Sequence, residues 1–155
     1  MRQAYVFEGV AVIVGPWHEP MTPPERGTRV EVRVLEDAPK RGSRFAAERV
    51  VLDQPVFRAD LFDQTDKPAG NLAAAHFHPG FEGIEPSDRV WEDVIKQDPT
   101  GWLAGELSDL PALLKRGGFD ATGANWLDTD TAAVRAAVPT IVAAVEATWA
   151  EVRTD

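Results

Sequence analysis

Residues 29–34 read Arg-Val-Glu-Val-Arg-Val, and this stretch sets the expected fold of the first half of the chain. Its three valines alternate strictly with charged residues. Because successive side chains of a strand point to opposite faces, the alternation predicts a strand with one buried face and one wet face. A sheet with one wet face is typical of antiparallel pairing, so we expect an antiparallel sheet.

Further strands are expected on both sides of this segment. Residues 5–14, 49–53, 56–63 and 72–78 are rich in β-branched and aromatic side chains, which favour strands. Residues 15–27 contain Pro16, Pro20, Pro23 and Pro24. Proline lacks the backbone N–H that regular structure uses, so this segment is expected to be a long loop.

The second half of the chain changes to a helical period. A first short helix is expected from Ser87, with Val90, Trp91, Val94 and Ile95 as its apolar stripe. A second is expected from Asp98 and Pro99, because an acidic cap followed by proline favours a helix start. A third is expected from Ser108 to the Gly117-Gly118 pair, which favours a helix end.

The last segment predicts a long helix. Its apolar residues recur at spacings of three and four, as on one face of a helix: Val134, Val138, Ile141, Val145, Trp149 and Val152. Asp128 or Asp130 is expected to cap its start. Pro139 lies in the middle, where it removes a hydrogen bond and clashes with the carbonyl of Arg135, so a kink or break is expected there.

Together these patterns predict one α+β domain over residues 1–155. An antiparallel β-sheet from the N-terminal half would be followed by short helices and then by a long kinked C-terminal helix packed on it. Alanines cover much of the rest of that helix. Its second side would therefore pack either against the sheet and short helices or against a second subunit, as in a homodimer.

Composition excludes several classes of function. The 155 residues include 25 acidic and 16 basic ones, a formal charge of −9, and no cysteine. Disulfides and thiolate zinc sites are thereby excluded. An acidic chain lacks the basic face that nucleic acid or an anionic membrane surface requires, so neither is expected as a partner. No apolar run approaches the roughly 20 residues of a membrane helix, and a cytoplasmic location is expected.

Residues 56–78 predict a hairpin that gathers polar side chains on one face. Its turn lies at residues 65–71, where Pro68 and Gly70 suit a tight turn. Residues opposite each other on paired strands share a face. If the apolar sides of both strands share the core, Asp60 pairs with His76 and Arg58 pairs with His78, and a slip by one residue would put the histidines in the core.

This arrangement supports two kinds of chemistry. The triplet His76-Phe77-His78 points two imidazoles the same way, which suits a divalent metal such as zinc, with Glu82 as the third ligand. Asp60 is an alternative ligand or a hydrogen-bond partner of one ring, and Glu85 and His18 are further candidates. Without metal, Asp60, His76 and His78 would form an acid–base group, with Arg58 binding the anionic part of a substrate.

The spacing from Gly70 through His76-Phe77-His78 to Glu82 resembles the beginning of the first metal motif of cupins. The resemblance implies that His76, His78 and Glu82 reach one ion. It covers under a tenth of the chain, Arg89 stands where the motif ends in glycine, and no later histidine supplies the second motif.

Two other interpretations remain open at this point, and the sequence does not decide whether the protein is an enzyme. Arg58 and Asp60 would form a simple surface ion pair if the histidines were merely exposed. Alternatively, the chain is a non-enzymatic partner of another protein, with Trp17, in the expected loop, as the contact or substrate-binding aromatic. Trp91, Trp102 and Trp149 lie on apolar helix faces and are expected in the core.

Overall fold

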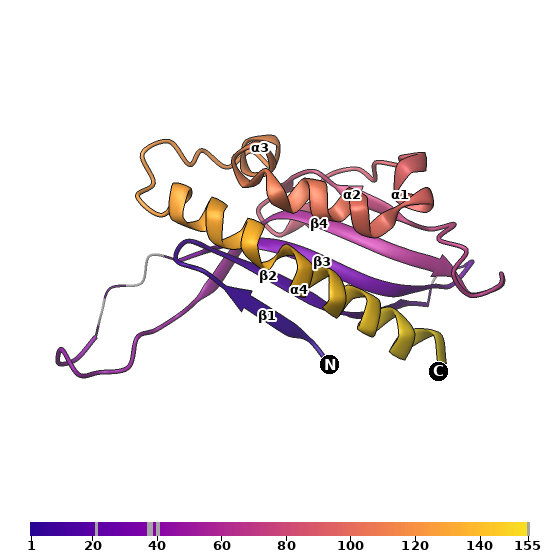
Figure 1. Ribbon diagram of the computed structural model, residues 1–155, viewed down its shortest axis with the longest axis horizontal. Helices are drawn as coiled ribbons and strands as arrows, with labels where there is room; N and C mark the ends of the chain where they lie inside the picture. Colours follow the sequence, from indigo (N-terminus) through magenta and orange to yellow (C-terminus); the bar gives the residue numbers. More distant parts are fainter. Residues whose placement is uncertain (21, 37–38, 40, 155) are drawn as a thin grey trace.

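The computed structural model of the chain describes residues 1–20, 22–36, 39 and 41–154. It confirms an α+β fold built on a five-stranded antiparallel sheet, in which the strands keep their chain order from β1 to β5. Figure 1 labels the first four of these strands. A separate ribbon pairs two short strands, β6 and β7. The bounds are β1 (Gln3–Val6), β2 (Val10–Glu19), β3 (Glu25–Leu35), β4 (Leu52–Gln64), β5 (His76–His78), β6 (Phe81–Glu82) and β7 (Glu85–Pro86).

The strand bounds correct the sequence prediction in two places. Residues 5–14 form parts of two strands, because the chain turns between β1 and β2 with the Phe7 amide donating to the Val10 carbonyl at 2.9 Å. Residues 49–53 are not a strand of their own. β4 runs through Pro55, which pairs with Arg33 beside register shifts in the ladder, where a residue without an N–H is tolerated.

The expected loop over residues 15–27 is also wrong. β2 continues through Pro16 to Glu19, and β3 begins at Glu25. The pairing of β1 with β2 ends at Gln3 and Val14, so Pro16 lies where β2 is an edge strand, and edge strands tolerate proline. Met21, within the same segment, lies outside the described residues.

The short helices are α1 (Asp93–Gln97), α2 (Pro99–Ser108) and α3 (Leu110–Arg116). The first helix does not begin at Ser87, because Val90 is held extended by two backbone hydrogen bonds to Phe77. The predicted start of α2 is confirmed, since the Asp98 carboxylate accepts from the Gly101 amide at 2.9 Å. α3 is capped by Asp109, one residue after the expected Ser108.

The last helix, α4 (Leu127–Thr154), is continuous through Pro139, so no break occurs (Figure 1). Pro139 is exposed, and the carbonyl that it leaves unpaired can therefore bond water. The expected stripe is confirmed from Val134 to Trp149, where Val134, Val138, Ile141, Val145 and Trp149 are buried, whereas Val152 is only half-buried. Neither predicted aspartate caps the helix. Asp130 lies inside its first turn and accepts instead from the backbone of Glu8, Gly9 and Val10.

α4 packs on two sides, against the sheet at β2 and β3 and against α2. It is the one helix among the described residues whose length and composition would allow it to span a membrane, over Leu127–Arg153. Its buried stripe forms part of the main core. Core helices of soluble proteins can have the same length and apolar composition. Successive side chains of β3 and β4 point to opposite faces of the sheet, so every second residue points away from the core. The candidate site lies on the face away from the core.

Candidate functional site

The predicted register of the 56–78 hairpin is confirmed residue by residue. In the pairing of β4 with β5, Asp60 lies opposite His76 and Arg58 lies opposite His78. The predicted second strand is shorter than expected, since β5 spans only His76–His78. Asp60, His76 and His78, here called the Asp–His cluster, place their ligand atoms within 4.8 Å of one another.

The Asp–His cluster is buried rather than surface-exposed. Relative exposure is 1% for Asp60, 1% for His76 and 4% for His78. Trp91 covers one side, with its ring centre 5.0 Å from that of His76, and the Phe62 ring meets His76 edge-on. The interpretation in which Asp60 and Arg58 form a simple surface ion pair is therefore wrong.

Asp60 also receives an arginine that the sequence analysis did not select. Arg29 lies opposite Asp60 on β3, and its Nε and Nη2 atoms donate to the two carboxylate oxygens at 2.6 and 3.3 Å. The strict alternation of residues 29–34 places Arg29 on the wet face, which is the signal that could have found it. The missing information was the pairing of β3 with β4, because residues far apart in the chain meet only when the sheet forms.

Both histidines use one ring nitrogen to bind the backbone. The Nδ1 atom of His76 lies 2.7 Å from the Ala74 carbonyl oxygen, and that of His78 lies 2.5 Å from the Ser87 carbonyl oxygen. A carbonyl only accepts, so each Nδ1 carries a proton and donates it. The neutral rings therefore carry their lone pairs on Nε2, the atom that faces Asp60.

The two Nε2 atoms lie beside the same carboxylate oxygen. The distance to Asp60 Oδ2 is 3.4 Å for His76 and 3.6 Å for His78. Charge-assisted N–H···O hydrogen bonds are shorter, about 2.7–2.9 Å. Among the described residues, His76 Nε2 has no hydrogen-bond partner although it is buried.

Arg58 lies between Asp60 and His78. Its Nη2 atom is 3.0 Å from His78 Nε2, and its Nε atom is 3.1 Å from Asp60 Oδ2. A guanidinium only donates, so His78 Nε2 accepts here, which agrees with the tautomer set by Ser87. Arg58 thus touches the cluster itself.

These surroundings shift the pKa of Asp60 and the pKa of Arg58. Burial alone raises the pKa of Asp60, but the hydrogen bonds and positive charge of Arg29 oppose this effect, and the pKa is held well below its ordinary value. Burial lowers the pKa of Arg58, and repulsion by Arg29 acts in the same direction. Asp60 is therefore the anion at the centre of the site.

The other predicted site residues lie elsewhere. Glu82 and Glu85 are exposed partners in the ribbon of β6 and β7 and are not part of the Asp–His cluster. His18 is exposed on β2. Trp17 lies on β2 rather than in a loop, with the Arg29 guanidinium 3.7 Å from the centre of its ring.

The three tryptophans that were expected in the core divide between core and surface. Trp149 is buried, and Trp102 packs against the core as expected. Trp91 is 49% exposed, so its assignment to the core is wrong. It precedes α1 instead of belonging to a helix, and this allows its ring to lie over His76.

Fold and site together define an α+β protein with a buried carboxylate, two histidines and two arginines on the side of the sheet away from the core. The five-stranded sheet, which continues into helices, is not the cupin fold that the local spacing resembles. Comparisons with protein families, curated protein sequences and solved structures found no match.

Proposed function

We propose that the protein binds a divalent first-row transition metal, with Asp60, His76 and His78 as its protein ligands. The observation that carries the proposal is the spacing of these ligand atoms. Two ligands on a tetrahedral zinc, each at about 2.0–2.2 Å from the metal, lie roughly 3.3–3.5 Å from each other. The two histidine-to-Asp60 distances are 3.4 and 3.6 Å.

The backbone contacts of the histidines support the same proposal. Metal-binding histidines usually donate their second ring N–H to a carbonyl or carboxylate, which fixes the ring and its tautomer. His76 and His78 both make this contact through Nδ1. The unpartnered Nε2 of His76 is a buried lone pair beside a carboxylate, and a bound cation would satisfy both.

The donor set favours a borderline metal over a hard one. Two imidazole nitrogens and one carboxylate oxygen suit zinc, nickel or copper, whereas calcium and magnesium prefer oxygen ligands. Three protein ligands leave a fourth position for water. A cytoplasmic location, which the cysteine-free composition supports, is part of this proposal.

Arg58 is expected to compete with the metal. Its guanidinium contacts both Asp60 Oδ2 and His78 Nε2, two of the atoms that would bind the ion. Metal binding therefore requires Arg58 to move away, and its positive charge opposes a nearby cation. Replacing Arg58 should consequently strengthen metal binding.

The test is a zinc titration of chelator-stripped protein against a chromogenic competitor, with the metal content measured after desalting. We expect one zinc per chain, loss of binding in His76→Ala, and tighter binding in Arg58→Gln. His18→Ala is the matched control, because His18 is the third histidine of the chain and is exposed on β2. It should bind zinc like the parent.

Circular dichroism of each variant establishes that it is folded, and the conservative His78→Gln variant serves if His76→Ala is not. Absence of stoichiometric zinc in the parent protein would overturn the proposal. Equal loss of zinc in His18→Ala and His76→Ala would also overturn it, because the ions would then be bound at exposed imidazoles.

A further inference from the structure

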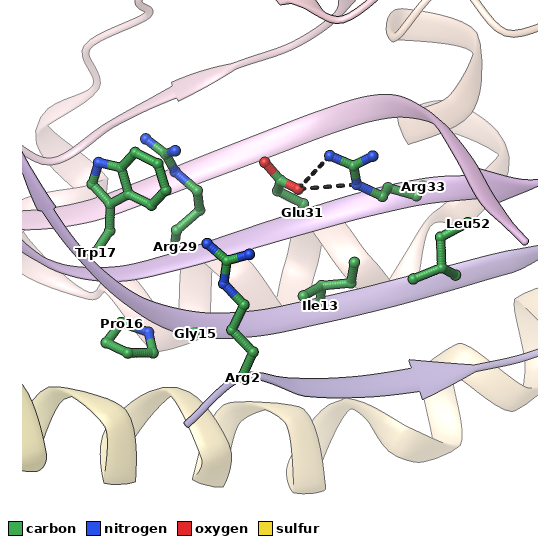
Figure 2. Close-up of a pocket in the computed structure, with 9 residues that line it drawn as sticks. All are labelled: Arg2, Ile13, Gly15, Pro16, Trp17, Arg29, Glu31, Arg33 and Leu52. Carbon is green, nitrogen blue, oxygen red and sulfur yellow. Dashed lines mark hydrogen bonds and ion pairs between the residues drawn. The ribbon is translucent and has the colours of Figure 1, made fainter.

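A groove of about 350 Å³ lies on the same side of the sheet, beside the Asp–His cluster. Figure 2 shows its lining, which comes from β2, β3, the start of β4 and the residue before β1. Its charged lining residues are Arg2, Arg29, Arg33 and Glu31. The volume lies in the range of about 300–1,000 Å³ that small-molecule sites occupy.

Gly15 allows Arg2 to reach this groove. A Cβ atom at Gly15 would lie 2.6 Å from Cγ of Arg2, closer than non-bonded atoms approach. The Arg2 side chain therefore crosses β2 over the one residue that has no side chain, as Figure 2 shows. Glycine weakens a strand interior, so its presence here is explained by a close approach of this kind.

Positive charge exceeds negative charge in the groove. Glu31, the only acidic residue among the described residues lining it, is held by the Nε and Nη2 atoms of Arg33 at 3.0 and 2.9 Å. Arg29 is held by Asp60, which Arg58 also contacts. Within the described part of the chain, no hydrogen bond or ion pair holds the Arg2 guanidinium. An anion placed beside Arg2 and Arg29 would balance the excess.

Arg29 is positioned for this role. Its hydrogen bonds to Asp60 and its contact with the Trp17 ring, 3.7 Å from the ring centre, limit its movement. A guanidinium fixed in advance loses less conformational freedom when a ligand binds. The chain as a whole carries a charge of −9, so this local excess of arginine is not a general property of its surface.

We infer that this groove binds a small organic carboxylate. The carboxylate group would lie between Arg2 and Arg29, since guanidinium groups match the planar geometry of carboxylates. The apolar part of the ligand would lie against Ile13, Pro16 and Leu52, which line the same groove. The groove residues do not belong to the Asp–His cluster, although Arg29 contacts Asp60, and the inference does not require a bound metal.

The test is a titration followed by ¹H–¹⁵N NMR, in the presence of a chelator, with three probes. Benzoate offers a carboxylate and an apolar ring, acetate a carboxylate alone, and inorganic phosphate an anion of different geometry. We expect saturable shifts at the Gly15 amide and the Trp17 indole N–H, with benzoate binding more tightly than acetate or phosphate. Phosphate binding as tightly as benzoate would overturn the inference.

Four variants test the residues. Arg2→Gln should weaken benzoate binding by about tenfold, the loss expected for one charged hydrogen-bond donor. Gly15→Ala should weaken it similarly by displacing Arg2, whereas Glu31→Gln should strengthen it. Arg49→Gln is the control with the same change of charge, because Arg49 is exposed and lines a different cavity. Equal effects of Arg2→Gln and Arg49→Gln would overturn the inference, because binding would then follow overall charge.

Discussion

The Nε2 atom of His76 lies 3.4 Å from the Oδ2 atom of Asp60, and both side chains are 1% exposed. With the Nδ1 proton of His76 donated to the Ala74 carbonyl, the neutral ring turns a lone pair toward the carboxylate. Two acceptors that face each other in a buried site repel, and a cation or a second proton between them removes the repulsion. This relationship is why the metal titration is the decisive experiment on the site.

The first prediction concerns the stability of the protein at low pH. Because the folded-state pKa of Asp60 is depressed, its ionised form adds stability above its ordinary pKa, and that contribution is lost as pH falls below about 4. The stability difference between the parent and Asp60→Asn should therefore shrink by about 1 kcal/mol between pH 7 and pH 3. Urea unfolding at both pH values measures it, and a constant difference would contradict the prediction.

The second prediction concerns the link between α4 and the turn between β1 and β2. The buried Asp130 carboxylate accepts from the amides of Glu8, Gly9 and Val10 at 2.8–3.1 Å. Asp130→Ala leaves these donors unpaired and should cost roughly 3 kcal/mol or more in the free energy of unfolding. Asp128→Ala, an exposed change on the same turn of the helix, should cost less than about 1 kcal/mol. Similar losses in both variants would show that the buried contacts are not responsible.

The third prediction concerns the contact of α4 with β4. The indole N–H of Trp149 donates to the Leu61 carbonyl at 2.8 Å in a buried position. Trp149→Phe removes the donor and should lower the free energy of unfolding by about 1–3 kcal/mol. Trp91→Phe, at a position that is 49% exposed, should cost less than about 1 kcal/mol. Denaturant unfolding measures the loss in the free energy of unfolding for both variants. A larger loss in Trp91→Phe than in Trp149→Phe would contradict a stabilising role of the buried Trp149 hydrogen bond.

The fourth prediction concerns Pro139, which is exposed within a continuous helix. Pro139→Ala restores an N–H that can donate to the Arg135 carbonyl and removes the ring clash. The variant should gain about 1–3 kcal/mol, and a domain of this size gains about 2–4 °C in Tm for each kcal/mol. Thr140→Ala, an exposed neighbour, should shift Tm by far less. A lower Tm in Pro139→Ala would mean that α4 depends on the proline.

Local patterns predicted much of the fold because they depend on neighbours in the chain. The alternation at residues 29–34, the stripe from Val134 to Trp149 and the cap at Asp98 each reflect the geometry of a single element. The predictions failed where a distant contact decided the outcome. Val90 stays extended because its backbone bonds that of Phe77. Pro16 is tolerated in a strand because no residue of β1 pairs with it.

The candidate site shows the same division between local patterns and contacts of distant residues. The sequence by itself determined that Arg58, Asp60, His76 and His78 share one face, because side chains alternate along a strand and the apolar sides of both strands must face the core. The tertiary structure alone decided that Arg29 holds Asp60, that Trp91 covers His76, and that Glu82 stays apart. The physical reason is that strand pairing and loop packing join residues far apart in the chain, and no periodicity along the chain records such contacts.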